Sequence, residues 1–175
     1  MDLHKADYST VIKFGSLDDL LSKLKLEGQN ISDIIDTKDA NGISLFQKTL
    51  ISRKFEVAHY LLNKNVKINV ISKEGFNELH YLAANINFDG AIDLARLLIQ
   101  RGCDLSQIDN KYGNTAMLSI CLELLKRQSD DGMKFLEEVL SNHQNIDISN
   151  NSGISVRKLL TERGPDKIKE LIKEE

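Results

Sequence analysis

Residues 54–75 read KFEVAHYLLNKNVKINVISKEG and combine two periodicities in one segment. Helical spacing of apolar side chains in the first half gives one stripe, which consists of Phe55, Ala58, Leu61 and Leu62. After a polar turn at residues 63–65, apolar and polar side chains alternate, as in an extended segment: Val66, Ile68 and Val70. A helix with a single apolar stripe cannot bury it alone, so the segment predicts neighbours of the same kind.

The same pattern recurs twice further along the chain. Residues 93–113, DLARLLIQRGCDLSQIDNKYG, and residues 135–153, FLEEVLSNHQNIDISNNSG, each pair an apolar helical stripe with an extended part that ends in glycine. A short polar residue follows two places after each closing glycine, before a second apolar segment: Ser44, Asn77, Thr115 and Ser155. The repeat therefore predicts a series of helix pairs connected by turns.

This unit resembles the ankyrin repeat, whose pattern is roughly D-x-x-G-x-T-P-L-H-x-A-A, then an aliphatic helix and G-A-D-x-N. Residues 54–69 and 93–104 are the best local matches, and Leu79–His80 keeps the Leu-His pair. The proline of the pattern is replaced in four units, by Leu45, Glu78, Ala116 and Val156. The resemblance covers residues 8–173. It implies an all-α ankyrin-repeat solenoid of about five helix-pair units, with N- and C-terminal caps and short hairpin loops.

We expect one domain over residues 1–175, divided into five units: 8–37 as the N-terminal cap, 38–71, 72–108, 109–148, and 149–175 as the C-terminal cap. The predicted helices cover residues 8–14, 16–26, 45–52, 56–63, 78–85, 91–101, 116–127, 133–140 and 166–173. Residues 1–7 are expected to be an unpacked polar terminus, and Lys23 to face solvent. Residues 129–132, SDDG, are predicted to form a turn before the helix at 133.

Composition narrows the function classes. Hydrophobic residues make up 41% of the 175 residues, charged residues 28%, and the net charge is only -3, as in an ordinary water-soluble domain. Lysine and arginine are spread along the chain, so no nucleic acid is expected as partner. The N-terminus carries no apolar leader and no apolar run reaches about 18 residues, so we expect no membrane and a cytoplasmic location.

No catalytic or metal-binding pattern is visible in the chain. Cys103 and Cys121 lack a CxxC partner, so both are interpreted as reduced core residues. The GxSxG and GxxxxGK motifs are absent, and the four histidines are separated: His4, His59, His80 and His143. We therefore expect no enzyme, no cofactor and no metal. The resemblance implies structural roles for His80, as a link to the neighbouring loop, and for Gly42, Gly75, Gly102, Gly113 and Gly153.

The resemblance also implies a protein-binding function, because ankyrin-type proteins mostly bind proteins through their hairpin tips and concave inner-helix face. The positions that vary in the family give these candidates: Asn41, Ile43, Lys73, Glu74, Phe76, Asn85, Lys111, Tyr112, Asn114, Glu123, Ser152 and Ile154. Phe76 and Tyr112 are the candidate anchors, since interfaces favour large aromatic side chains. The alternative is that both rings pack against the adjacent hairpin.

Free-standing ankyrin-like proteins with degenerate repeats resemble bacterial products, and we expect a monomer with one protein partner. Two more specific functions stay open. One is an immunity or inhibitor protein for a cognate toxin, and the other is a host-directed effector or regulator.

Overall fold

The computed structural model describes residues 1–142 and 145–173, and within these ranges the chain is helical. The helices are α1 Tyr8–Phe14, α2 Leu17–Glu27, α3 Ile31–Ile34, α4 Leu45–Ile51, α5 Phe55–Leu62, α6 Glu78–Ala83, α7 Ala91–Gln100, α8 Ala116–Arg127, α9 Asp130–Asn142, α10 Val156–Arg163 and α11 Asp166–Leu171. The described residues form only isolated β-bridges, between Lys38 and Ser44 and between Ile108 and Thr115. The all-α prediction is therefore confirmed.

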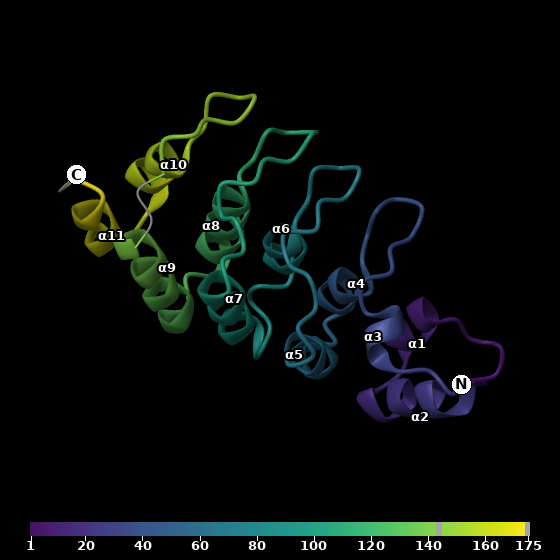
Figure 1. The fold of residues 1–175 in the computed structure, drawn as a ribbon. Helices are drawn as coiled ribbons and strands as arrows, with labels where there is room; N and C mark the ends of the chain where they lie inside the picture. Colours follow the sequence, from purple (N-terminus) through teal and green to yellow (C-terminus); the bar gives the residue numbers. More distant parts are fainter. Residues whose placement is uncertain (143–144, 174–175) are drawn as a thin grey trace.

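The helices lie in two rows (Figure 1). Consecutive contacts join α1, α4, α6, α8 and α10 into the first row, and α5, α7, α9 and α11 follow one another in the second. From α4 on, each first-row helix packs on the helix that follows it in the second row, for example α4 on α5 and α6 on α7, whereas α1 packs on α2. The two termini lie at opposite ends of the rows (Figure 1).

The first-row helices begin where the sequence places a short polar residue. The side chains of Ser44, Asn77, Thr115 and Ser155 each accept a hydrogen bond from the backbone N–H three residues later. This contact satisfies one of the N–H groups that a helix start leaves without an intrahelical partner. The residue two places after each closing glycine is thus an N-cap.

One continuous core runs between the rows from α1 to α11. The apolar stripe of α5 supplies Leu61 and Leu62, and those of α7 and α9 supply Leu98 and Phe135, all of them buried. Cys103 and Cys121 are also buried, and desolvation raises the pKa of both thiols, that of Cys121 to about 12.

Glu78, at a position where the family pattern has proline, is completely buried in this core. Its carboxylate accepts hydrogen bonds from the backbone N–H groups of Asn69 at 2.9 Å and Val70 at 3.1 Å, and from Gln47 Nε2 at 3.2 Å. Burial nevertheless raises the pKa of this carboxyl above its usual value. Glu78 therefore links α6 both to α4, thirty-one residues earlier, and to the preceding segment at residues 69–70, in a way that proline could not.

The N-terminal unit differs from the prediction. Lys23 is only 2% exposed, and its Nζ donates to the carbonyl of Leu3 at 3.0 Å and pairs with Glu27. Leu3 and Ala6 pack against the core, so residues 1–7 cover the helix face that would otherwise be exposed. The solvent-facing assignment of Lys23 was wrong because it was made from the periodicity of α2 alone.

Two further differences concern helix boundaries. The SDDG turn is instead the start of α9, which begins at Asp130; the Met133 N–H donates to the Ser129 carbonyl at 2.9 Å. The short helix α3 was not predicted; at its start the Asn30 N–H donates to Asp33 Oδ2 at 2.9 Å. Among the described residues, no helix combines the length and the apolar character that crossing a membrane requires.

Candidate functional site

Four loops project from the same side of the first row, one before each of α4, α6, α8 and α10 (Figure 1). We call their turns the tip loops: residues 39–42, 72–75, 109–113 and 150–153. Backbone hydrogen bonds connect each tip loop to the next. Lys73 N–H donates to Asn41 O at 2.9 Å, Asn110 N–H to Glu74 O at 2.9 Å, and Asn151 N–H to Tyr112 O at 3.0 Å. This series, the tip ladder, fixes the loops relative to one another.

Each tip loop is also held internally by its first residue. Asp39 Oδ1 accepts the N–H groups of Asn41 and Ile43, at 2.9 and 3.0 Å. Asn150 Oδ1 does the same for Ser152 and Ile154, both at 3.0 Å. Side chains that bond to their own turn in this way stabilise the local backbone. The tips are therefore built as fixed turns.

The tip loop at 109–113 is one residue longer than the others. Its closing bond runs from Gly113 N–H to Asp109 O, four residues apart, whereas Gly75 N–H closes on Ser72 O, three residues apart. Tyr112 lies in this longer turn and its side chain is 54% exposed. The Nζ atom of Lys111 lies 4.7 Å from the centre of the Tyr112 ring, within cation–π range.

The predicted binding residues fall into two groups. Several have exposed side chains at the tips, namely Asn41, Lys73, Glu74, Lys111, Tyr112 and Ser152. Phe76 belongs to the second group, because its ring is only partly exposed and stacks on His80, with ring centres 5.1 Å apart and an interplanar angle of 4°. The ring of Tyr81 also packs against the Phe76 ring in a T-shaped arrangement, with ring centres 5.3 Å apart. Phe76 and Tyr112 thus occupy different environments.

The other members of the second group are also engaged within the chain. Asn85 Nδ2 donates to the Leu50 carbonyl at 2.9 Å, and Asn114 Oδ1 accepts from Asn150 Nδ2 at 2.7 Å. Glu123 pairs with Lys126 on α8. The partly buried side chains of Ile43 and Ile154 pack against the core.

His80 lies between two successive units. Its Nε2 is 3.2 Å from the carbonyl of Asn114, and its Nδ1 faces Asn77 at the start of α6. A carbonyl can only accept, so Nε2 carries the proton in this contact. Burial lowers the pKa of His80, which favours the neutral ring. His143 lies outside the described residues.

The predicted structural glycines all have left-handed backbone conformations. The φ angles are +76° at Gly42, +80° at Gly75, +84° at Gly102, +71° at Gly113 and +70° at Gly153. Residues with a Cβ atom are disfavoured in this region, whereas glycine adopts it readily.

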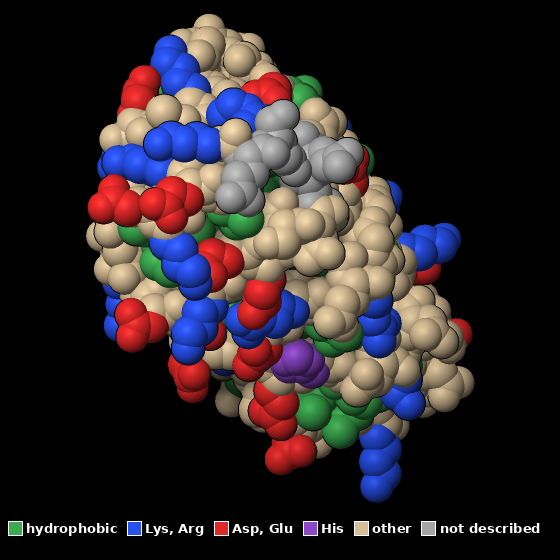
Figure 2. Space-filling model, turned by 90° about the vertical axis from the view of Figure 1, so that its left-hand side faces the viewer, with side chains coloured by type: hydrophobic (Ala, Val, Ile, Leu, Met, Phe, Trp, Pro, Cys, Tyr) green, Lys and Arg blue, Asp and Glu red, His purple; other side chains and the backbone are tan. Residues whose placement is uncertain are grey.

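The charges around the C-terminal half are mixed in sign. Figure 2 shows Lys and Arg side chains interspersed with Asp and Glu over this end of the molecule. Arg96 pairs with Asp93, Asp131 and Glu138, and Lys167 pairs with Glu137. Over residues 1–142 and 145–173, no three His, Cys, Asp or Glu side chains are grouped so that they could hold a metal ion.

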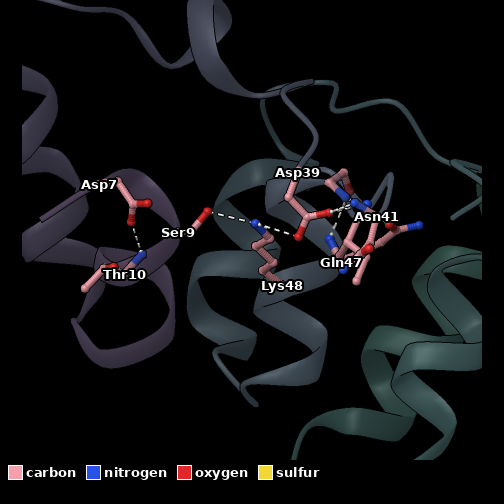
Figure 3. Close-up of polar contacts among 9 residues, drawn as sticks. Asp7, Ser9, Thr10, Asp39, Asn41, Gln47 and Lys48 are labelled. Atoms are coloured by element: carbon pink, nitrogen blue, oxygen red, sulfur yellow. Dashed lines mark hydrogen bonds and ion pairs between the residues drawn. The ribbon is translucent and has the colours of Figure 1, made fainter. Parts of the chain in front are cut away.

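A groove between α1 and α4 was not predicted. It has a volume of about 370 Å³ and is lined by Ser9, Thr10, Lys13, Phe14, Ile43, Lys48, Ile51 and Ser52. Phe14 is 68% exposed and Ile51 43% exposed. Figure 3 shows Lys48 between the two elements, where its Nζ donates to Ser9 Oγ at 2.8 Å and pairs with Asp39 at 3.1 Å. The sequence contains one indication of this groove: Phe14 is a large aromatic residue, yet it lies outside the apolar positions Val11 and Ile12 that α1 buries.

No family model matches the chain, and no curated protein matches it. Among solved structures, 487 chains match. One of them belongs to a complex described as the Bd0816 predatory endopeptidase from Bdellovibrio bacteriovorus with the immunity protein Bd3460. It aligns with a TM-score of 0.66 and 18% identity, over 95% of this chain and 79% of that one. At this level of identity the likeness shows a shared fold.

Proposed function

We propose that the chain is an ankyrin-repeat-type, non-enzymatic protein-binding module that holds one protein partner across its tip loops and first-row helices. The tip ladder carries this proposal, because it keeps exposed side chains from four loops on a backbone that is already ordered. A surface ordered before binding avoids the entropy cost of ordering loops in the complex. Loops on a fixed scaffold are also where binding residues are most often found.

Tyr112 is the proposed anchor of this surface. Its side chain is half-exposed on a turn that has one extra residue, and the ring has no core position to fill. Truncation of an aromatic anchor typically costs about 2 kcal/mol of binding free energy, or roughly a 30-fold loss of affinity. Phe76 is not proposed as a second anchor, since its ring already stacks on His80.

Affinity capture from the native cells tests the proposal. Tagged wild-type chain and a Tyr112→Ala variant are compared after circular dichroism has shown that both fold. Leu26→Ala is the matched control, because Leu26 is 45% exposed and lies on α2, away from the tips. We expect one stoichiometric partner that the control retains and Tyr112→Ala loses. Equal capture by all three proteins would contradict the tip site, and no capture by any would contradict the binding function in those cells.

A second, more specific candidate is an immunity protein that neutralises a cognate toxin. It is supported by the fold shared with a chain from the endopeptidase–immunity protein complex. The test is to express the toxic product of a neighbouring gene with and without this chain. We expect growth only when the chain is present, and reduced protection with Tyr112→Ala. Growth arrest both with and without this chain would contradict the immunity function and would leave the host-directed effector or regulator as the alternative.

A further inference from the structure

We propose that the groove between α1 and α4 receives a segment of the protein partner in which an aliphatic or aromatic side chain lies next to an Asp or Glu. This inference rests on the proposed protein-binding function and gives the partner a stated chemistry. Three features of the groove support this partner chemistry: its apolar lining, the charged side chains around it, and its position beside the first tip loop.

The apolar part of the groove is formed by three side chains from three separate elements. Phe14 comes from the end of α1 and Ile51 from the end of α4. Ile43 is the residue that directly follows the first tip loop. Phe14 and Ile51 are among the most exposed large hydrophobic residues of the described chain. A single apolar side chain of a partner would remove all three from water at once, which favours binding.

The charged groups that line the groove are Lys13 and Lys48, and no carboxylate lines it. Lys48 is already compensated by Asp39, at 3.1 Å. Two carboxylates of neighbouring segments bond to backbone N–H groups: Asp7 Oδ1 accepts the Thr10 N–H at 2.7 Å, and Asp39 Oδ1 holds the first tip loop. Lys13 has no ion-pair partner among the described residues, and its Nζ lies 5.1 Å from the Phe14 ring. The groove thus presents one ammonium group, that of Lys13, with no carboxylate in ion-pair contact among the described residues, beside its apolar floor.

The groove is also continuous with the tip ladder. Ile43 belongs to the same turn as Asn41, whose carbonyl accepts the first bond of the ladder from Lys73. A partner that lies along the tips therefore reaches the groove at its N-terminal end without crossing unrelated surface. Charge complementarity then selects an acidic neighbour for the apolar side chain, because a carboxylate would meet Lys13.

The chemistry can be tested without knowing the partner. Two blocked tetrapeptides, acetyl-Gly-Leu-Asp-Gly-amide and acetyl-Gly-Leu-Lys-Gly-amide, are titrated separately into the ¹⁵N-labelled chain. We expect the Asp peptide to shift amide signals of residues 9–14 and 43–52, and the Lys peptide to shift them at least tenfold less at equal concentration. Lys13→Glu should reverse this preference, whereas Lys134→Glu, an exposed position on α9, should leave it unchanged. Absent shifts, or equal shifts with both peptides, would overturn the proposal.

The full partner is tested by photocrosslinking in native cells, with p-benzoylphenylalanine at position 14 or at position 112. We expect crosslinks from both positions to one protein, with the position 14 crosslink in a peptide that has an apolar residue beside Asp or Glu. Crosslinks from position 112 alone would overturn the proposal that the partner occupies the groove and would leave the proposed binding function intact. No crosslink from either position would contradict both, and a crosslink from position 14 to a second copy of this chain would show that the occupant is wrong.

Discussion

Replacement of Gly75 by alanine measures how tightly the tip loops approach one another. At Gly75, with φ +80°, a Cβ atom would lie 2.9 Å from three atoms of the next loop, namely Asn110 N, Asn110 Oδ1 and Ile108 O. Gly153 is the matched control, because it has the equivalent place in its tip loop and φ +70°, but no atom within 4 Å of the added Cβ. The two substitutions share the conformational strain and differ in the steric contact.

The expected free energies follow from these two contributions. A left-handed conformation costs an alanine about 1–2 kcal/mol, so Gly153→Ala should lose that amount of unfolding free energy. Overpacking against backbone adds about 1–3 kcal/mol, so Gly75→Ala should lose about 2–5 kcal/mol. The backbone bond from Asn110 to Glu74 lies at this contact and would be strained as well.

The assay is urea unfolding followed by circular dichroism, supported by melting temperatures, which shift by about 2–4 °C per kcal/mol for a chain of this size. The informative quantity is the difference between the two variants, since the strain that they share cancels. Equal losses for Gly75→Ala and Gly153→Ala would refute the close approach of the loops and, with it, the ordered tip surface.

Three further outcomes are expected. Leu62→Ala, at a fully buried position, should lower the unfolding free energy measured in urea by about 2–5 kcal/mol. Leu26→Ala should lower it by about 0.5 kcal/mol or less. Similar losses in the two variants would contradict the burial of Leu62 in the core. Burial lowers the pKa of His80, so the unfolded chain binds protons more readily below about pH 6.5 and stability should fall as the pH decreases through that value. In the His80→Gln variant, the unfolding free energy should change less between about pH 7.5 and about pH 5.5 than in wild type. An equal change in both proteins would show that His80 does not cause this pH dependence. Because burial raises the pKa of the thiols of Cys103 and Cys121, both should resist Ellman's reagent in the folded chain and react once urea unfolds it; rapid labelling of folded protein would contradict their burial.

The helices that the sequence predicted best are those whose limits are set locally. The predicted ranges 8–14 and 116–127 coincide with α1 and α8, where a capping side chain, Asp7 or Thr115, fixes the start. The burial of Lys23 could not be predicted in this way, because it depends on a carbonyl twenty residues earlier in the chain. The burial of Glu78 could not be predicted locally either. Its carboxylate oxygens find hydrogen-bond donors only when Gln47, Asn69 and Val70 lie beside them in the folded chain.

The same distinction applies to the candidate binding surface. The resemblance placed both Phe76 and Tyr112 at hairpin tips, but Phe76 follows the closing glycine of its loop and Tyr112 precedes its own. The loop of Tyr112 also has one additional residue, as a comparison of SKEGF at 72–76 with DNKYG at 109–113 shows. The contact between Phe76 and His80 follows from the side-chain geometry around α6 and required the structure. The groove could also be recognised only in the structure, because its walls come from α1 and α4, which are separated by about thirty residues of sequence.

The two proposed contact regions lie on one series of backbone hydrogen bonds. The groove begins at Ile43, beside Asn41; the ladder then passes through Lys73, Glu74 and Asn110 and reaches the turn that carries Tyr112. A partner that uses both regions therefore depends on the spacing that Gly75 permits, although Gly75 itself is buried and would not touch it. Gly75→Ala should weaken binding even under conditions in which the variant is fully folded, and Gly153→Ala, which lies beyond Tyr112 on the ladder, should weaken it less. If both variants bound as well as wild type, the partner would contact one region and not both.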